Sequence, residues 1–144
     1  MGTGAGQLPP HAATITVRTS PELDQLTMLR ALSDTVTLNA ALSAEETEDV
    51  RVALDEVATA LICASVRDAP IECEFVTRPG QLSITVGAVA AAADAIGEKT
   101  LPWQVLDTVT HSFATVAEPF DPERHGFPVT VGFVRTHETG PADG

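Results

Sequence analysis

The sequence predicts an α/β (α+β) fold: a two-layer sandwich with helices on one face of a mixed, mostly antiparallel sheet. Residues 43–66 have the start signal and the apolar spacing of one long helix. Residues 71–76 and 81–86 have the composition of strands and flank a Pro-Gly turn, as in a hairpin. Strand and helix patterns are mixed along the chain rather than strictly alternating. This favours two layers over a doubly wound parallel sheet.

The first strand is expected at residues 13–20, where Ile15 and Val17 alternate with polar residues. Ser20 and Pro21 then have the residue types of a helix N-cap and a first helical turn. The helix that they begin is predicted to have an apolar stripe formed by Leu23, Leu26, Leu29, Leu32 and Val36.

The second helix starts with the spacing of a capping box, Ser43 followed by Glu46, and is expected to run to about Val66. In the hairpin that follows, Pro79 and Gly80 are expected in the turn. The alanine-rich residues 87–96 then show no clean period.

A third helix is expected from about Pro102, with one face formed by Trp103, Leu106, Val109, Phe113 and Val116. Residues 121–126 are predicted to be a loop, and residues 127–136 the last strand.

The length of 144 residues suits one domain, expected at residues 13–136. Residues 1–12 and 137–144 are rich in Gly, Pro or polar residues and are expected to be disordered tails. The glycines at the start superficially resemble a phosphate-binding loop. Because no strand precedes them and no helix follows, a tail is the better interpretation.

The formal net charge of −12 argues against nucleic acid and membrane surfaces as direct partners, and favours a basic protein partner. The longest apolar run, residues 86–97, contains Asp94 and is too short to cross a bilayer. The N-terminus lacks the features of a secretion signal, so a cytoplasmic location is expected. Cys63 and Cys73 are expected to be reduced and buried, and the spacing of the histidines predicts no metal site.

Two segments and the order of elements carry a resemblance to a known family. VRVALDEVATALICAS followed by DAPIECEFV resembles the second helix and the next strand of the RsbW and SpoIIAB anti-sigma factors, and WQVLDTVTHSFATV resembles their last helix. These factors belong to the histidine-kinase-like ATPase (GHKL) superfamily. The chain is most similar to their actinobacterial, UsfX-type branch that acts on sigma-F. The resemblance covers about residues 13–136.

The resemblance implies a homodimer that sequesters a stress-type sigma factor and is countered by an anti-anti-sigma protein with a STAS domain. Typical members also phosphorylate that protein on serine, using ATP and Mg²⁺. Glu56 matches the position of the family's catalytic base. The family's Mg²⁺-holding asparagine is expected four residues later, where this chain has Ala60, which has no side-chain oxygen.

The rest of the implied ATP site also departs from the family pattern. Ala88 stands near the position of the family's aspartate, which binds the adenine amino group. Gly87 alone remains of the glycines that let the backbone approach the nucleotide. Gly97 alone remains of the glycine-rich lid, and Lys99 is the nearby cation. We therefore expect no metal site, and weak or absent binding of ATP and Mg²⁺, at a degenerate site formed by Glu56, Ala60, Gly87, Ala88, Gly97 and Lys99.

Glu56 also has a simpler interpretation. It borders the apolar stripe of its helix, where a glutamate is usually just solvated. The resemblance implies that Arg30, flanked by Leu23, Leu26 and Thr27, contacts the sigma factor. Alternatively, Arg30 pairs with an acidic neighbour on its own helix, one of Glu22, Asp24 and Asp34.

Ile15 and Val17 are candidates for a dimer interface if their strand is an edge, or they belong to the core. Three hypotheses for the function remain open. The first is an anti-sigma factor that acts by binding alone. The second is an active serine-protein kinase with an altered ATP site. The third is an adaptor that binds only an anti-anti-sigma protein. Ala60 and the missing glycines favour the first over the second.

Overall fold

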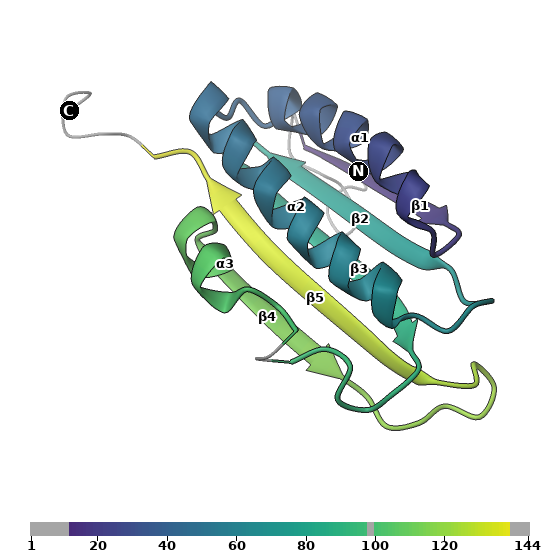
Figure 1. Cartoon of the computed structure of the whole chain (residues 1–144). Helices are drawn as coiled ribbons and strands as arrows, with labels where there is room; N and C mark the ends of the chain where they lie inside the picture. The colour runs from purple at the N-terminus through teal and green to yellow at the C-terminus, as the bar shows by residue number, and fades with distance from the viewer. Residues whose placement is uncertain (1–11, 98–99, 139–144) are drawn as a thin grey trace, which may run out of the picture.

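The computed structural model describes residues 12–97 and 100–138. In this part of the chain five strands form one sheet with the order β1-β2-β3-β5-β4 (Figure 1). The strands are β1 (Ala13–Thr19), β2 (Ile71–Arg78), β3 (Gln81–Ala90), β4 (Ser112–Ala117) and β5 (Phe127–Thr136). All four neighbouring pairs are antiparallel, so the expected mostly antiparallel sheet is antiparallel throughout these residues.

The helices cover one face of this sheet (Figure 1). They are α1 (Leu26–Asn39), preceded by the 3-10 turn η1 (Leu23–Gln25), then α2 (Ala44–Ala64) and α3 (Trp103–Val109). In β2 the alternating residues Ile71, Cys73, Phe75 and Thr77 are buried on the helix side, whereas Glu72 and its alternates are not. The α+β class and the single layer of helices expected from the sequence are therefore confirmed.

The capping box at the start of α2 is confirmed. The Ser43 hydroxyl accepts a hydrogen bond of 3.0 Å from the Glu46 amide, and Glu46 Oε1 accepts one of 2.8 Å from the Ser43 amide. These bonds satisfy two backbone donors that a helix start otherwise leaves unpaired. One buried side of α2 packs on the sheet, with Leu54, Val57 and Leu61 in the core.

The expected N-cap of the first helix is wrong. The Ser20 hydroxyl donates to Glu22 Oε1 at 3.1 Å instead of accepting from an amide, and neither η1 nor α1 has a side-chain cap. The chain enters α1 through the tighter η1 turn, a common start for an α-helix. The expected stripe holds from Leu26 to Val36, but Leu23, in η1, is 52% exposed.

The long third helix is also wrong beyond its first seven residues. Helix α3 ends at Val109, and Ser112–Ala117 forms the edge strand β4 beside β5. Two of the side chains expected on this helical face still contact each other. The ring centroids of Trp103, on α3, and Phe113, on β4, are 4.7 Å apart. The β-branched residues around Thr110 favour extended backbone, and pairing with β5 decides the conformation.

The hairpin, the loop and the last strand are confirmed. Strands β2 and β3 are joined by the two residues Pro79 and Gly80, and Gly80 takes a positive φ of 73° that glycine adopts without strain. Strand β3 continues to Ala90, so it absorbs the start of the alanine-rich segment. Residues 121–126 form a loop closed by a bridge between Asp121 and Gly126.

The two cysteines differ in exposure. Cys73 is buried in β2 as expected, and burial raises the pKa of its thiol to about 12. Cys63 is exposed on α2, so the expectation that it is buried is wrong. Among the described residues, no helix combines the length and the apolar composition that crossing a bilayer requires.

Candidate functional site

Glu56 lies exposed on the side of α2 that faces β5. Asp49, two helical turns earlier on the same side, forms an ion pair of 3.1 Å with Arg135 of β5. Ala60, one turn after Glu56, packs against the core. The two α2 residues of the expected ATP site are therefore neighbours on one side of the helix, as their spacing predicts.

Gly87 and Ala88, expected just after the second strand of the hairpin, are part of that strand, β3. Gly87 and Ala88 belong to β3, where they pair with Thr130 and Val129 of β5. Ala88 is buried on the helix side, below α2. Gly87 points to the other face of the sheet, because successive strand residues alternate. The structure thus brings Ala88 to the same side as Glu56 and Ala60, and separates Gly87 from them.

The segment between β3 and α3 folds onto the core. Its apolar residues Ile96 and Leu101 are 8% and 3% exposed, and Ala60 and Trp103 pack against the same core. The Gly97 carbonyl accepts hydrogen bonds from the Leu101 amide at 3.1 Å and from the Trp103 indole Nε1 at 3.2 Å. Lys99, the cation expected here, lies outside the described residues.

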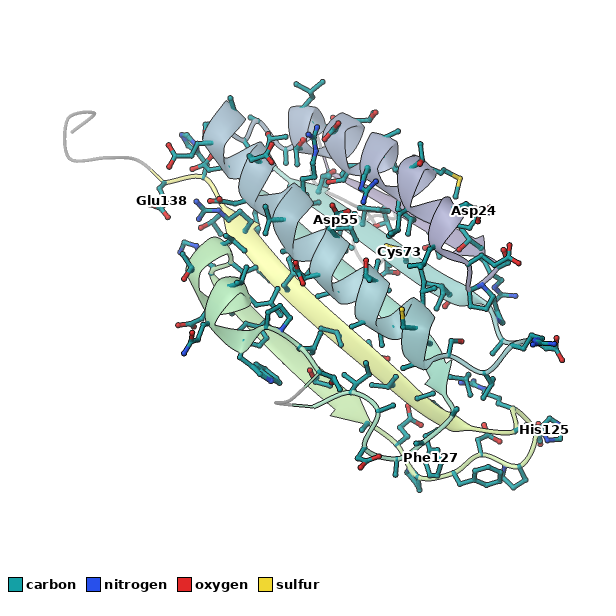
Figure 2. The ribbon with its side chains drawn as sticks, viewed as in Figure 1. Asp24, Asp55, Cys73, His125, Phe127 and Glu138 are labelled. Atoms are coloured by element: carbon teal, nitrogen blue, oxygen red, sulfur yellow. The ribbon has the colours of Figure 1, made fainter. Side chains whose placement is uncertain are left out.

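Arg30 on α1 is held by a residue of the neighbouring helix. Its Nε donates a 2.7 Å hydrogen bond to Oδ1 of Asp55 on α2; Asp55 is labelled in Figure 2. Within the described part of the chain, Glu22, Asp24 and Asp34, the partners considered from the sequence, form no hydrogen bond or ion pair with it. Within the same residues its two terminal nitrogens have no hydrogen-bond partner, and the side chain is 44% exposed.

The residues expected beside Arg30 divide between surface and core. Leu23 is 52% exposed, and Thr27 is also exposed. Leu26 is 8% exposed and packs in the core beneath α1. Ile15 and Val17 lie on β1, which is an edge strand as required, but they face the helix side opposite Phe75 and Cys73.

A hollow in the surface lies away from Glu56. It has a volume of about 680 Å³ and is bounded by residues 66–70 and by the 118–125 segment. Its floor is formed by the β3 and β5 backbones around Gly87 and Thr130, and its rim carries both arginines and carboxylates, including Arg18 and Glu72. His125 lies at the tip of one bounding loop (Figure 2) and adopts a positive φ of 59°.

Glu46 forms a second polar centre, at the other end of the sheet. Its carboxylate accepts hydrogen bonds from the amides of Ser43 and Glu138 and from Nδ1 of His137, at 2.7–2.9 Å. Burial alone would raise the pKa of Glu46, but these bonds outweigh it and lower the pKa to about 2. The carboxylate therefore anchors the end of β5 to the first turn of α2.

Two of these features could not be found from the sequence. Glu46 was identified as a capping residue, but its bond with His137 joins positions 91 residues apart. The hollow depends on the strand order, which no local pattern reveals. Among the described residues there is no group of His, Cys, Asp or Glu side chains arranged to hold a metal ion. A comparison with models of protein families found none that matches the sequence, and a comparison with curated proteins found no match either.

Proposed function

We propose that this chain is an anti-sigma factor that sequesters an alternative sigma factor by stoichiometric binding. The observation that carries the proposal is the geometry of Arg30. Asp55 holds the guanidinium through Nε, while its terminal nitrogens have no hydrogen-bond partner among the described residues and the side chain is 44% exposed. A guanidinium held in this way is ready to bind a carboxylate through two parallel hydrogen bonds, and less side-chain entropy is lost when a partner binds.

The surroundings of Arg30 support a protein partner. Leu23, seven residues before Arg30, is 52% exposed and supplies apolar contact area for a partner. The net charge of −12 favours encounter with a basic protein, and sigma factors bind DNA through basic surfaces. In this proposal an anti-anti-sigma protein with a STAS domain competes for the chain and releases the sigma factor.

The histidine-kinase-like ATPase fold is part of the same proposal. The capped helix α2 with Glu56 on its surface, the hairpin, the folded loop and α3 agree with the order that the resemblance implies. The segment that resembles the family's last helix includes β4, and this is a departure from the pattern. ATP and Mg²⁺ are not required for binding in this proposal, because Ala60 supplies no metal ligand and Ile96 and Leu101 anchor the loop without nucleotide.

The proposal is tested by capturing partners from an extract of the native cell with the tagged chain, in parallel with ATP and Mg²⁺ added and with nucleotide removed. We expect a sigma factor in both eluates. Arg30→Ala should abolish its capture, whereas Arg124→Ala, a matched arginine on a distant loop, should not.

Each other result identifies a different function. Capture of the sigma factor only with ATP would indicate an active nucleotide site. Phosphate transfer to the anti-anti-sigma protein would identify a serine-protein kinase. Capture of the anti-anti-sigma protein without any sigma factor would identify an adaptor.

A further inference from the structure

Strand β4 (Ser112–Ala117) forms one edge of the sheet (Figure 1). It pairs with β5 along its whole length, without a bulge. The backbone amides just outside its two ends, those of His111 and Glu118, also donate to carbonyls of β5. In the described part of the chain no other segment hydrogen-bonds to the β4 backbone. Among these residues, the amides and carbonyls on the outer side of β4 are therefore free to pair with another strand.

The sequence of β4 does not protect this edge. Edge strands are usually blunted by charged side chains, proline or a bulge, and Ser-Phe-Ala-Thr-Val-Ala contains none of these. Val116 is 58% exposed, and Phe120, shortly after the strand, is 52% exposed and packs edge-on against Phe127. Exposed β-branched and aromatic side chains favour pairing with a further extended segment.

The charges on either side of β4 indicate which kind of segment fits. The nearest Asp, Glu, Lys or Arg residues along the chain are both acidic: Asp107, on α3, and Glu118, directly after the strand. Both are exposed, and neither forms an ion pair among the described residues. A segment that is uncharged in the middle and basic at its ends is complementary to this pattern.

We propose that β4 binds an extended, basic segment of a partner protein, which adds to the five-stranded sheet as a further strand beside β4. Main-chain hydrogen bonds provide the affinity, and a side chain of the segment packs against Val116. Six residues of the partner match the six of β4, a length of about 20 Å. Lysine or arginine residues beyond them lie near Asp107 and Glu118.

This edge is distinct from the surface proposed to bind a sigma factor. Arg30 lies on α1, which packs over β2, on the other side of the sheet from β4 (Figure 1). A second copy of this chain is a poor occupant of the edge, because acidic residues flank its own β4 and each chain carries −12.

The test measures binding of a labelled synthetic peptide, Lys-Lys-Val-Thr-Val-Thr-Val-Thr-Lys-Lys with blocked ends, to the purified full chain by fluorescence anisotropy. We expect a dissociation constant below about 100 µM. Methylating alternate amide nitrogens along one edge of the peptide removes its donors on that edge. Of the two peptides methylated on opposite edges, one should bind at least about tenfold more weakly than the unmodified peptide.

Variants of the chain locate the peptide. Val116→Lys should weaken binding at least about fivefold, whereas Leu38→Lys, at a 79% exposed position on α1, changes the net charge equally and should not. Glu118→Lys should weaken binding of the basic peptide and strengthen binding of a peptide with Glu in place of each Lys. Because one variant must gain and lose affinity for different peptides, a folding defect cannot produce this result.

Hydrogen exchange shows whether the edge itself is used. We expect the outer amides of β4 to exchange rapidly in the free chain and to be protected by the peptide. Outer amides that are already protected in the free chain would overturn the proposal. So would absence of binding at 1 mM peptide, equal binding of both methylated peptides, or association of the chain with itself through β4. None of these measurements needs a sigma factor or ATP, so their outcome is separate from that of the proposed function.

Discussion

Nε of Arg30 on α1 donates a 2.7 Å hydrogen bond to Oδ1 of Asp55 on α2. A second ion pair lies beside it with the charges exchanged between the helices: a terminal nitrogen of Arg51 on α2 lies 2.6 Å from Oδ2 of Asp34 on α1. Each helix thus contributes one arginine and one aspartate to the surface where α1 and α2 meet. Because these side chains are between 32% and 44% exposed, such pairs add little to stability, typically less than about 1 kcal/mol.

Removing the carboxylate that positions Arg30 should affect binding more than folding. Asp55→Ala is expected to lower the free energy of unfolding by less than about 1 kcal/mol. The same change should weaken binding of the captured sigma factor roughly fivefold, because Arg30 must then be ordered on binding. Urea unfolding and calorimetric titration measure the two effects. Arg51→Ala, which breaks the neighbouring pair, is the matched control, and an equal loss of affinity in both variants would contradict the role given to Asp55.

The Glu46 carboxylate should make stability depend on acidity. Its folded pKa of about 2 lies below the ordinary value of 4.5, so the ionised form stabilises the fold. That stabilisation is complete above pH 4.5 and is lost as the pH falls toward 2. Glu46→Gln is therefore expected to cost about 2 kcal/mol at pH 7, and the gap between variant and wild type should narrow between pH 4.5 and 2.

This prediction is checked by urea unfolding at a series of pH values. Glu45→Gln, an exposed carboxylate on the same helical turn, is the control and should leave the curve unchanged. A gap between Glu46→Gln and wild type that stays constant down to pH 2 would show that folding does not lower the pKa of Glu46.

The two cysteines should react at very different rates. Cys63 is exposed, whereas the Cys73 thiol is buried and its pKa is raised to about 12. We expect one thiol per chain to react with a disulfide reagent in the native state at pH 8, and two after unfolding in denaturant. Cys63→Ser should abolish the native reaction, and rapid modification of that variant would contradict the burial of Cys73.

Gly126 should tolerate no side chain. A Cβ atom there would lie 2.5 Å from Val89 Cγ1 and 2.7 Å from the Ala90 carbonyl oxygen. Because the second contact is with backbone, Gly126→Ala should lower the free energy of unfolding by about 1–3 kcal/mol. Gly97→Ala is the control, since a Cβ atom there meets nothing within 4 Å. Equal melting temperatures for wild type and Gly126→Ala would contradict this packing.

The sequence predicted those elements whose signals are local. The capping box at Ser43, the Pro79–Gly80 turn and the strand beginning at Phe127 depend on neighbouring residues, and the structure contains all three. Strand β4 was predicted as helix because Trp103, Val109 and Phe113 have helical spacing. Its conformation is decided by pairing with β5, which begins ten residues after β4 ends.

The candidate site was predictable only in part for the same reason. Helical spacing correctly placed Glu56 and Ala60 together, since both lie on one helix. The partner of Arg30 lies on another helix, 25 residues away, and could not be deduced from the residues around it. The hollow depends on the strand order, so it is visible only once the sheet is assembled.

The position of β5 between β3 and β4 has a consequence for folding during synthesis on the ribosome. Residues 127–136 are made after all the other strands, yet they form the interior of the sheet. At about 5–20 residues per second, the earlier strands must wait for them with unpaired edges in an aqueous cell. The nascent chain is therefore a natural client for chaperones until its last strand emerges.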